Sequence, residues 1–161
     1  MEENWAEALQ NVEDVWRRVQ GKDTAQPESG VEERVTMEQL MQSEADGAQQ
    51  YRLIAGLAAG RSAETLQTMA AECRQGLKQL QTEFFMETGD TFVPQKMPME
   101  TDGLLGYLRR AYLQEGKNAN RYLMAAASAQ REPLRQLYGG LARRCTARQE
   151  KLYALAGVVL G

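Results

Sequence analysis

Two glutamates in this chain stand where a carboxylate needs a partner. Glu44 opens the stretch 44–51, and Glu115 opens the stretch 115–122. In each stretch an Ala follows the Glu by four residues and a Tyr follows it by seven, so the three side chains share one face of a helix. Because both faces are otherwise apolar, each carboxylate is expected in the core, where it needs an opposite charge, a proton or a metal ion.

Tyr51 and Tyr122, the tyrosines of these two stretches, offer a further partner. We expect both rings to pack in the core, with each hydroxyl bonded to a buried carboxylate. A radical or electron-transfer role for either tyrosine would require a metal centre.

The remaining residues that could do chemistry are few. The chain has no histidine, which removes the commonest general base and the commonest transition-metal ligand. Its two cysteines, Cys73 and Cys145, are too few for a disulfide framework. They either pack as small hydrophobes or, as thiolates, bind zinc or iron together with Glu44 and Glu115.

Four amphipathic helices must position these residues, and they form two helical hairpins. The first helix is expected to begin at Thr36, in a capping box with Gln39, and to stop before Gly60. The second is expected to run from near Ser62 to about Glu87. The third begins at about Asp102, with Leu105 and Tyr112 on its inner stripe, and the fourth has Pro133 in its first turn. Residues 88–101 contain two prolines and form the longest connection. The sequence therefore predicts an all-α fold, an antiparallel four-helix bundle.

The N-terminal part is expected to form a separate unit. Residues 4–19 carry apolar side chains at helical spacing and include both tryptophans of the chain, Trp5 and Trp16. Residues 21–30 form a polar linker. We therefore expect an N-terminal helical arm and linker over residues 1–35 and the bundle over residues 36–161.

Composition excludes several classes of protein. With 161 residues, 43% hydrophobic and 25% charged, the chain is an ordinary globular protein. A net charge of −3 without a basic stripe argues against nucleic acid as a partner. No apolar run is long enough for a membrane span, and the acidic start lacks the apolar core of a signal peptide, so a cytoplasmic protein is expected.

Each hairpin thus contains one Glu…Tyr stretch, which indicates that a single helical hairpin was duplicated. The duplicated hairpin, with its Glu on the inner stripe and a Tyr seven residues later, resembles the rubrerythrin-type branch of the ferritin-like superfamily. The resemblance covers roughly residues 36–158. In that family the first and third helices each supply a Glu to a di-iron centre, and the second and fourth each supply Glu-x-x-His. The resemblance implies that Glu44 and Glu115 stand at the single-Glu positions, and Tyr51 and Tyr122 agree with it.

The other half of the implied site departs from the family's pattern. Where the family has Glu-x-x-His, this chain has Cys73-x-x-Gly76 in the second helix and Cys145-x-x-Arg148 in the fourth. Both histidines and at least one bridging carboxylate are missing. The resemblance therefore implies a degenerate metal site.

A second register is open. Shifted by one residue, the family's Glu positions fall on Glu72 and Arg144 instead of Cys73 and Cys145. We prefer the cysteine register, because the cysteines fall on the apolar stripes and the other two residues lie at their margins.

Arg148 is the informative replacement, because a guanidinium can hold two carboxylates by bidentate hydrogen bonds. We expect it to form an ion-pair cluster with Glu44 and Glu115 and to take over the charge-balancing role of a metal.

Two functions follow from this reading. The first is a non-catalytic ferritin-like protein that needs no cofactor and serves as a structural or interaction module. The second is a rubrerythrin-like oxidoreductase or metal-binding protein with iron or zinc on an altered site of Glu44, Glu115, Cys73 and Cys145. The resemblance also implies a homodimer, since the family often pairs its bundles, whereas the sequence names no other protein partner.

Overall fold

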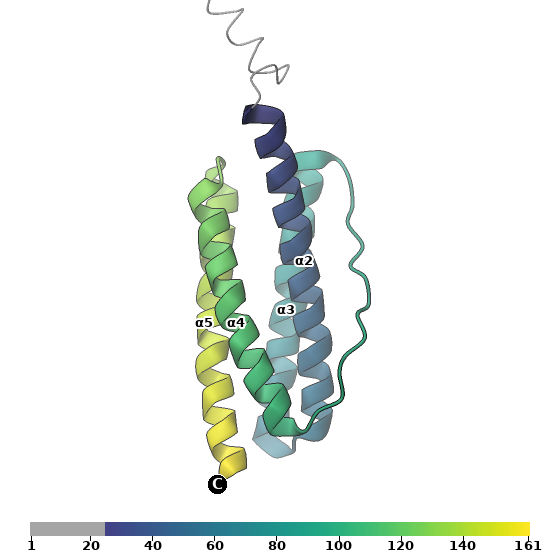
Figure 1. Ribbon diagram of the computed structural model, residues 1–161, viewed down its shortest axis with the longest axis vertical. Helices are drawn as coiled ribbons and strands as arrows, with labels where there is room; N and C mark the ends of the chain where they lie inside the picture. The colour runs from purple at the N-terminus through teal and green to yellow at the C-terminus, as the bar shows by residue number, and fades with distance from the viewer. Residues whose placement is uncertain (1–24) are drawn as a thin grey trace, which may run out of the picture. The chain divides into compact units, whose positions relative to one another are not determined.

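Four α-helices make up the part of the chain that the computed structural model describes, residues 25–161 (Figure 1). They are α2 (Ala25–Leu57), α3 (Gly60–Thr88), α4 (Leu104–Ser128) and α5 (Glu132–Leu160). These residues contain no strand, so the predicted all-α fold with four helices is confirmed. The chain divides into two units, Met1–Val35 and Thr36–Gly161. The predicted helix at residues 4–19 lies outside the described residues.

The start of α2 differs from the prediction. The helix begins at Ala25, so Thr36 lies inside it and does not cap it, and the second half of the expected linker is helical. Pro27 is the third residue of α2, in the first turn, where its missing N–H has no helical acceptor to lose. The Thr36–Gln39 capping box was therefore a chance match inside a longer helix.

Glycines set the two ends of α3. Gly60 begins the helix with a φ of 58°, which allows the chain to reverse directly after α2. Gly89 ends it in the left-handed region, with φ 73°, and donates its N–H to the Phe85 carbonyl oxygen at 2.8 Å. The tight turn between α2 and α3 makes them antiparallel, and the short turn between α4 and α5 does the same for the second hairpin (Figure 1).

The connection between the hairpins runs along the bundle from one end to the other (Figure 1). An extended chain over residues 89–103 reaches roughly 50 Å, which exceeds the length of α3, roughly 43 Å. Glutamine side chains hold it: Gln42 donates from Nε2 to the Gln95 carbonyl oxygen at 2.8 Å and accepts from the Gln95 N–H at 2.9 Å. Gln81 donates to the Phe92 carbonyl oxygen at 3.3 Å. Because the connection changes ends, α3 and α4 run in the same direction.

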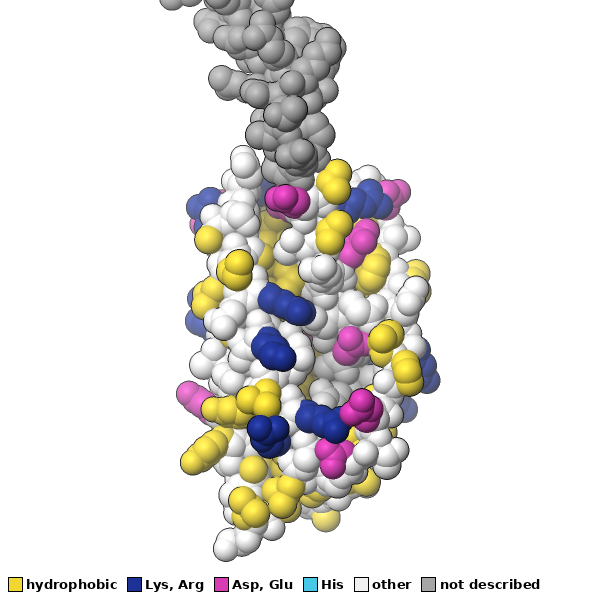
Figure 2. Space-filling view, viewed as in Figure 1, with side chains coloured by type: hydrophobic (Ala, Val, Ile, Leu, Met, Phe, Trp, Pro, Cys, Tyr) yellow, Lys and Arg dark blue, Asp and Glu magenta, His cyan; other side chains and the backbone are white. Residues whose placement is uncertain are grey.

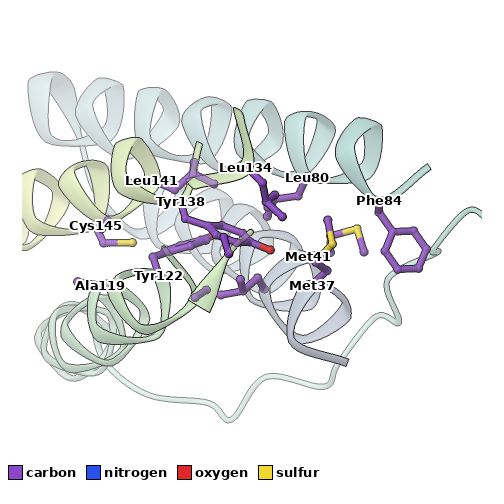
Figure 3. Close-up of a cluster of buried hydrophobic side chains, with 14 residues drawn as sticks. Met37, Met41, Leu80, Phe84, Ala119, Tyr122, Leu134, Tyr138, Leu141 and Cys145 are labelled. Carbon is purple, nitrogen blue, oxygen red and sulfur yellow. The ribbon is translucent and has the colours of Figure 1, made fainter. Parts of the chain in front are cut away.

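The apolar core consists of two clusters, one toward each end of the bundle. Figure 3 shows the first, with side chains from all four helices, among them Met41, Leu80, Tyr122 and Tyr138. The second cluster contains Tyr51, Ile54, Leu66, Met69, Cys73, Leu108 and Leu152 with their neighbours. The residues between the two clusters are the candidate site.

One predicted inner stripe is wrong at two positions, whereas Leu108, Glu115, Ala119 and Tyr122 of the same stripe are buried as predicted. Leu105 and Tyr112 are exposed, whereas Tyr107, Leu108 and Ala111 are buried at the same end of α4. The two faces differ by a small rotation, and spacing alone allows either one. Tyr112 instead contacts Tyr153 of α5 at the surface, with 6.4 Å between ring centroids.

None of the described helices has the length and apolar character needed to cross a membrane.

Replacement of Thr36 by Ala tests the start of α2. Removal of a helix N-cap costs about 1 kcal/mol, whereas Thr→Ala inside a helix gains up to about 0.7 kcal/mol. Because Thr36 is internal and only partly buried, we expect an unchanged or increased free energy of unfolding for Thr36→Ala in urea denaturation. A loss of about 1 kcal/mol would restore the helix start predicted from the sequence.

Candidate functional site

A layer of charged and small residues separates the two apolar clusters. Each helix contributes one of them: Glu44 from α2, Gly76 from α3, Glu115 from α4 and Arg148 from α5. Each of the four lies between core residues of the first cluster and core residues of the second cluster along its own helix. The four positions therefore lie at the same depth in the bundle.

Arg148 holds the layer together. Its side chain is 2% exposed, and its Nε donates to Glu115 Oε1 at 2.8 Å. Its Nη2 lies 3.4 Å from Glu115 Oε2 and 4.0 Å from Glu44 Oε1. The guanidinium thus forms a two-armed pair with Glu115 and a longer contact with Glu44, which is the ion-pair cluster that the sequence predicts.

The two tyrosines cross-link the hairpins. Tyr51 of α2 donates its hydroxyl to Glu115 Oε1 of α4 at 2.6 Å. Tyr122 of α4 donates to Glu44 Oε1 of α2 at 2.5 Å. Each tyrosine thus bonds to the glutamate of the other hairpin, and the predicted bond between a tyrosine hydroxyl and a buried carboxylate is confirmed in both copies.

The environments of the two glutamates differ in spite of this symmetry. Glu115 has Arg148 on both oxygens, whereas Glu44 Oε2 is buried without a hydrogen-bond partner among the described residues. That oxygen faces Gly76: a Cβ at position 76 would lie 3.2 Å from it and 3.1 Å from the carboxyl carbon. Gly76 of the first hairpin stands at the repeat position that Arg148 occupies in the second hairpin. Because Gly76 has no side chain, the Glu44 carboxyl group occupies the space beside it.

Burial controls protonation in this layer. Burial raises the pKa of Glu44 above its ordinary value of 4.5, and Arg148 and the Tyr122 hydroxyl, which lower it, offset burial only in part. Burial alone would lower the pKa of Arg148, but its charged neighbours hold that pKa above the ordinary value. The cluster therefore favours a charged guanidinium on Arg148 and shifts Glu44 toward its protonated form.

Both cysteines lie at the edges of the charged layer as free thiols. Cys73 and Cys145 are fully buried, and Arg148 Nη2 lies 3.6 Å from Cys145 Sγ. Burial, followed by the nearby glutamates, raises the pKa of both thiols above their ordinary value. They are therefore protonated at neutral pH.

Glu72 is a member of the cluster that the sequence placed at its margin. Its Oε2 lies 3.6 Å from Arg148 Nη1, and its Oε1 lies 3.9 Å from Lys151 Nζ. With its side chain 29% exposed, it connects the buried layer to the surface between α3 and α5. Arg144, the corresponding residue of α5, is also only partly buried, so the cysteines are the inward-facing pair. The signal that could have found Glu72 is its spacing on α3, one residue before Cys73 on the side toward α5.

Within residues 25–161, no three carboxylate or thiol side chains are arranged to hold a metal ion.

The comparisons with known proteins return nothing: no family model, no curated protein and no solved structure matches this chain.

Gly76→Ala tests the packing of the Glu44 carboxyl group. A Cβ there would meet Glu44 and also Leu141 Cδ2 at 3.2 Å, so either a core side chain or the charged layer must shift. Gly56→Ala is the matched control, since a Cβ at Gly56 meets nothing within 4 Å and should raise helix stability by about 0.5–1 kcal/mol. We expect the Gly56 variant to gain stability and the Gly76 variant to lose it in urea denaturation. Equal gains in both variants would show that the Glu44 carboxyl group is not confined.

Glu44→Gln and Glu115→Gln test the asymmetry of the two carboxylates. Loss of Glu115 leaves Arg148 buried without its main partner, and breaking a buried pair in this way costs about 3–5 kcal/mol.

The raised pKa of Glu44 means that the folded state binds the proton more tightly than the unfolded state does. The stability from this proton is complete below pH 4.5 and is lost as the pH rises through the folded-state pKa.

Glu44→Gln should therefore gain stability relative to the wild type as the pH rises from 4.5 toward neutrality. Denaturation curves for the three proteins at several pH values check both expectations. Equal losses at neutral pH in the two variants would contradict the asymmetry.

Proposed function

We propose that this chain is a ferritin-like four-helix bundle of the rubrerythrin type in which a guanidinium replaces the di-iron centre, and that it serves as a structural or interaction module without redox chemistry. The observation that carries the proposal is the buried Arg148 side chain between Glu44 and Glu115.

The arrangement of the helices supports the ferritin-like part of the proposal. Two antiparallel hairpins are joined by an extended connection that changes ends, so α3 and α4 are parallel (Figure 1). The two glutamates and two tyrosines contact each other reciprocally across the hairpins. A repeat that began as one hairpin and was duplicated accounts for both features.

The residues of the charged layer do not fit a di-iron centre. A metal ion between the carboxylates would compete for the space and the charge-balancing role of a guanidinium that lies 2.8 Å from Glu115. The helix positions that supply Glu-x-x-His in the family carry Cys73, Gly76, Cys145 and Arg148. Thiols with raised pKa values are poor ligands at neutral pH, because the thiolate is the form that binds metal.

The layer also lacks the groups for acid–base or nucleophilic catalysis. Glu115 is neutralised by Arg148 and accepts from Tyr51, and burial raises the pKa of that tyrosine well above its ordinary value. No histidine is present to activate either cysteine. A stabilising role for the cluster is therefore the better supported one.

The interaction part of the proposal concerns the outer faces of α4 and α5. Large apolar side chains there are more than half exposed in two places: Leu123 and Met124 near the turn between α4 and α5, and Tyr153, Val158 and Leu160 near the C-terminal end of α5. Exposed apolar side chains favour contact with another protein surface where they gather. The homodimer stays a prediction.

Metal analysis tests this proposal against a working Glu/Cys metal site. We expect protein purified without chelator to contain no stoichiometric iron, manganese or zinc, and Fe²⁺ or Zn²⁺ to leave its Tm unchanged, because a bound metal must stabilise the native state. Arg148→Ala removes the competing cation, and we expect this variant to gain a rise in Tm with Zn²⁺. Glu44→Ala in the Arg148→Ala background should abolish that rise.

Stoichiometric metal in the wild type that is lost in a Glu44→Ala/Glu115→Ala variant would overturn the proposal in favour of a rubrerythrin-like metalloprotein. This result needs no variant of Arg148, so the test stands even if that variant does not fold.

A further inference from the structure

A cavity of about 490 Å³ opens between α2 and α4, beside the charged layer. Glu72, which contacts Arg148 between α3 and α5, does not line this cavity. One stripe of α4 lines it with Arg110, Gln114, Lys117 and Arg121, and a facing stripe of α2 lines it with Ser43, Asp46 and Gln50. Figure 2 shows Lys and Arg side chains gathered down the middle of this face, over the space between α4 and α2. Facing stripes of two helices in a bundle are ordinarily apolar, so these polar residues require an explanation.

The cations of this cavity are only partly neutralised. Arg110 is paired, with Glu100 at 2.8 Å and Asp102 at 3.3 Å. Lys117 and Arg121, one helical turn apart, form no ion pair with any residue that the structure describes. The opposing carboxylate, Asp46, accepts a hydrogen bond from Gln42 at 2.8 Å. The cavity therefore has an excess of positive charge along its α4 wall.

The floor of the cavity is polar and buried. Asn118 is 8% exposed and lines the cavity, with its side-chain oxygen accepting from Gln114 at 3.0 Å. Tyr51 and Glu115 lie beside it and are bonded to each other. Since Arg148 balances the charge of Glu115, this carboxylate does not cancel the cations above it. Gly47 contributes to the α2 wall beside this floor.

The basic character arose in only one copy of the repeat. With Glu44 matched to Glu115, Asp46 matches Lys117, Gly47 matches Asn118 and Gln50 matches Arg121. Each of these replacements in the second copy adds a positive charge or a hydrogen-bonding group to the cavity. Core packing and the helix repeat do not require such a bias.

We propose that this cavity binds a small organic anion through a carboxylate or phosphate group held by Lys117 and Arg121, with Asn118 at the floor. Its volume is in the range of small-molecule pockets, about 300–1,000 Å³, and buried polar groups beside flexible cations are the usual means of orienting such an anion. The proposal goes beyond the structural role of the charged layer. Of the residues that the metal test changes, only Glu115 also lines this cavity.

Thermal unfolding and calorimetric titration with two probes, inorganic phosphate and malonate, test the site. We expect at least one probe to raise the Tm of the wild type above the value in sodium chloride of the same ionic strength. In Lys117→Gln/Arg121→Gln we expect the Kd for that probe to rise about tenfold or more, as loss of two charge-assisted hydrogen bonds implies. A response to phosphate alone assigns a phosphorylated ligand, and a response to malonate alone assigns a carboxylate.

The matched control is Lys78→Gln/Arg109→Gln, which removes two exposed positive charges outside the cavity. This variant should bind the probe as the wild type does. The proposal is overturned if neither probe differs from sodium chloride, or if both double variants weaken binding equally, since the latter result means that only net charge matters. The proposed metal-free role is unaffected by either outcome.

Discussion

The ion pair between Arg148 and Glu115 is the constraint on which the rest of the bundle depends. A guanidinium that is 2% exposed cannot lose its partner without a large cost, so α4 and α5 must stay in one register. The tyrosine bonds extend the same condition to α2, since Tyr51 also donates to Glu115. The apolar clusters on either side then pack around a layer whose position is already determined.

Buried charges usually contribute less to stability than well-packed apolar residues would. Burial raises the pKa of Glu44, which favours the uncharged form of this carboxyl group and so offsets part of that cost. The layer also contributes specificity, because the bonds of Arg148, Tyr51 and Tyr122 to the two glutamates form in only one alignment of the helices. The repeat is thus symmetric in its glutamates and tyrosines and asymmetric at Gly76 and Arg148.

Much of the site could be predicted because its residues lie at core positions of strongly periodic helices. Glu44, Glu115, Tyr51, Tyr122, Cys73, Cys145 and Arg148 are all buried in the structure, and the spacing of apolar residues placed them there. Prediction was poorer where local signals compete. Thr36 satisfies a capping pattern inside a longer helix, and Leu105 and Tyr112 have the spacing of a stripe that is rotated away from the core.

By itself, the sequence determined the four helices apart from the start of α2, the two hairpins and most of the side chains that meet at mid-bundle, because helical periodicity and turn residues act locally. Only the tertiary structure decided which carboxylate Arg148 pairs with, which group fills the space beside Gly76, and that Glu72 reaches the cluster. It also brought the polar stripes of α2 and α4 to one cavity. These outcomes depend on distances between helices far apart in the chain, which the packing of the core sets and no local pattern encodes.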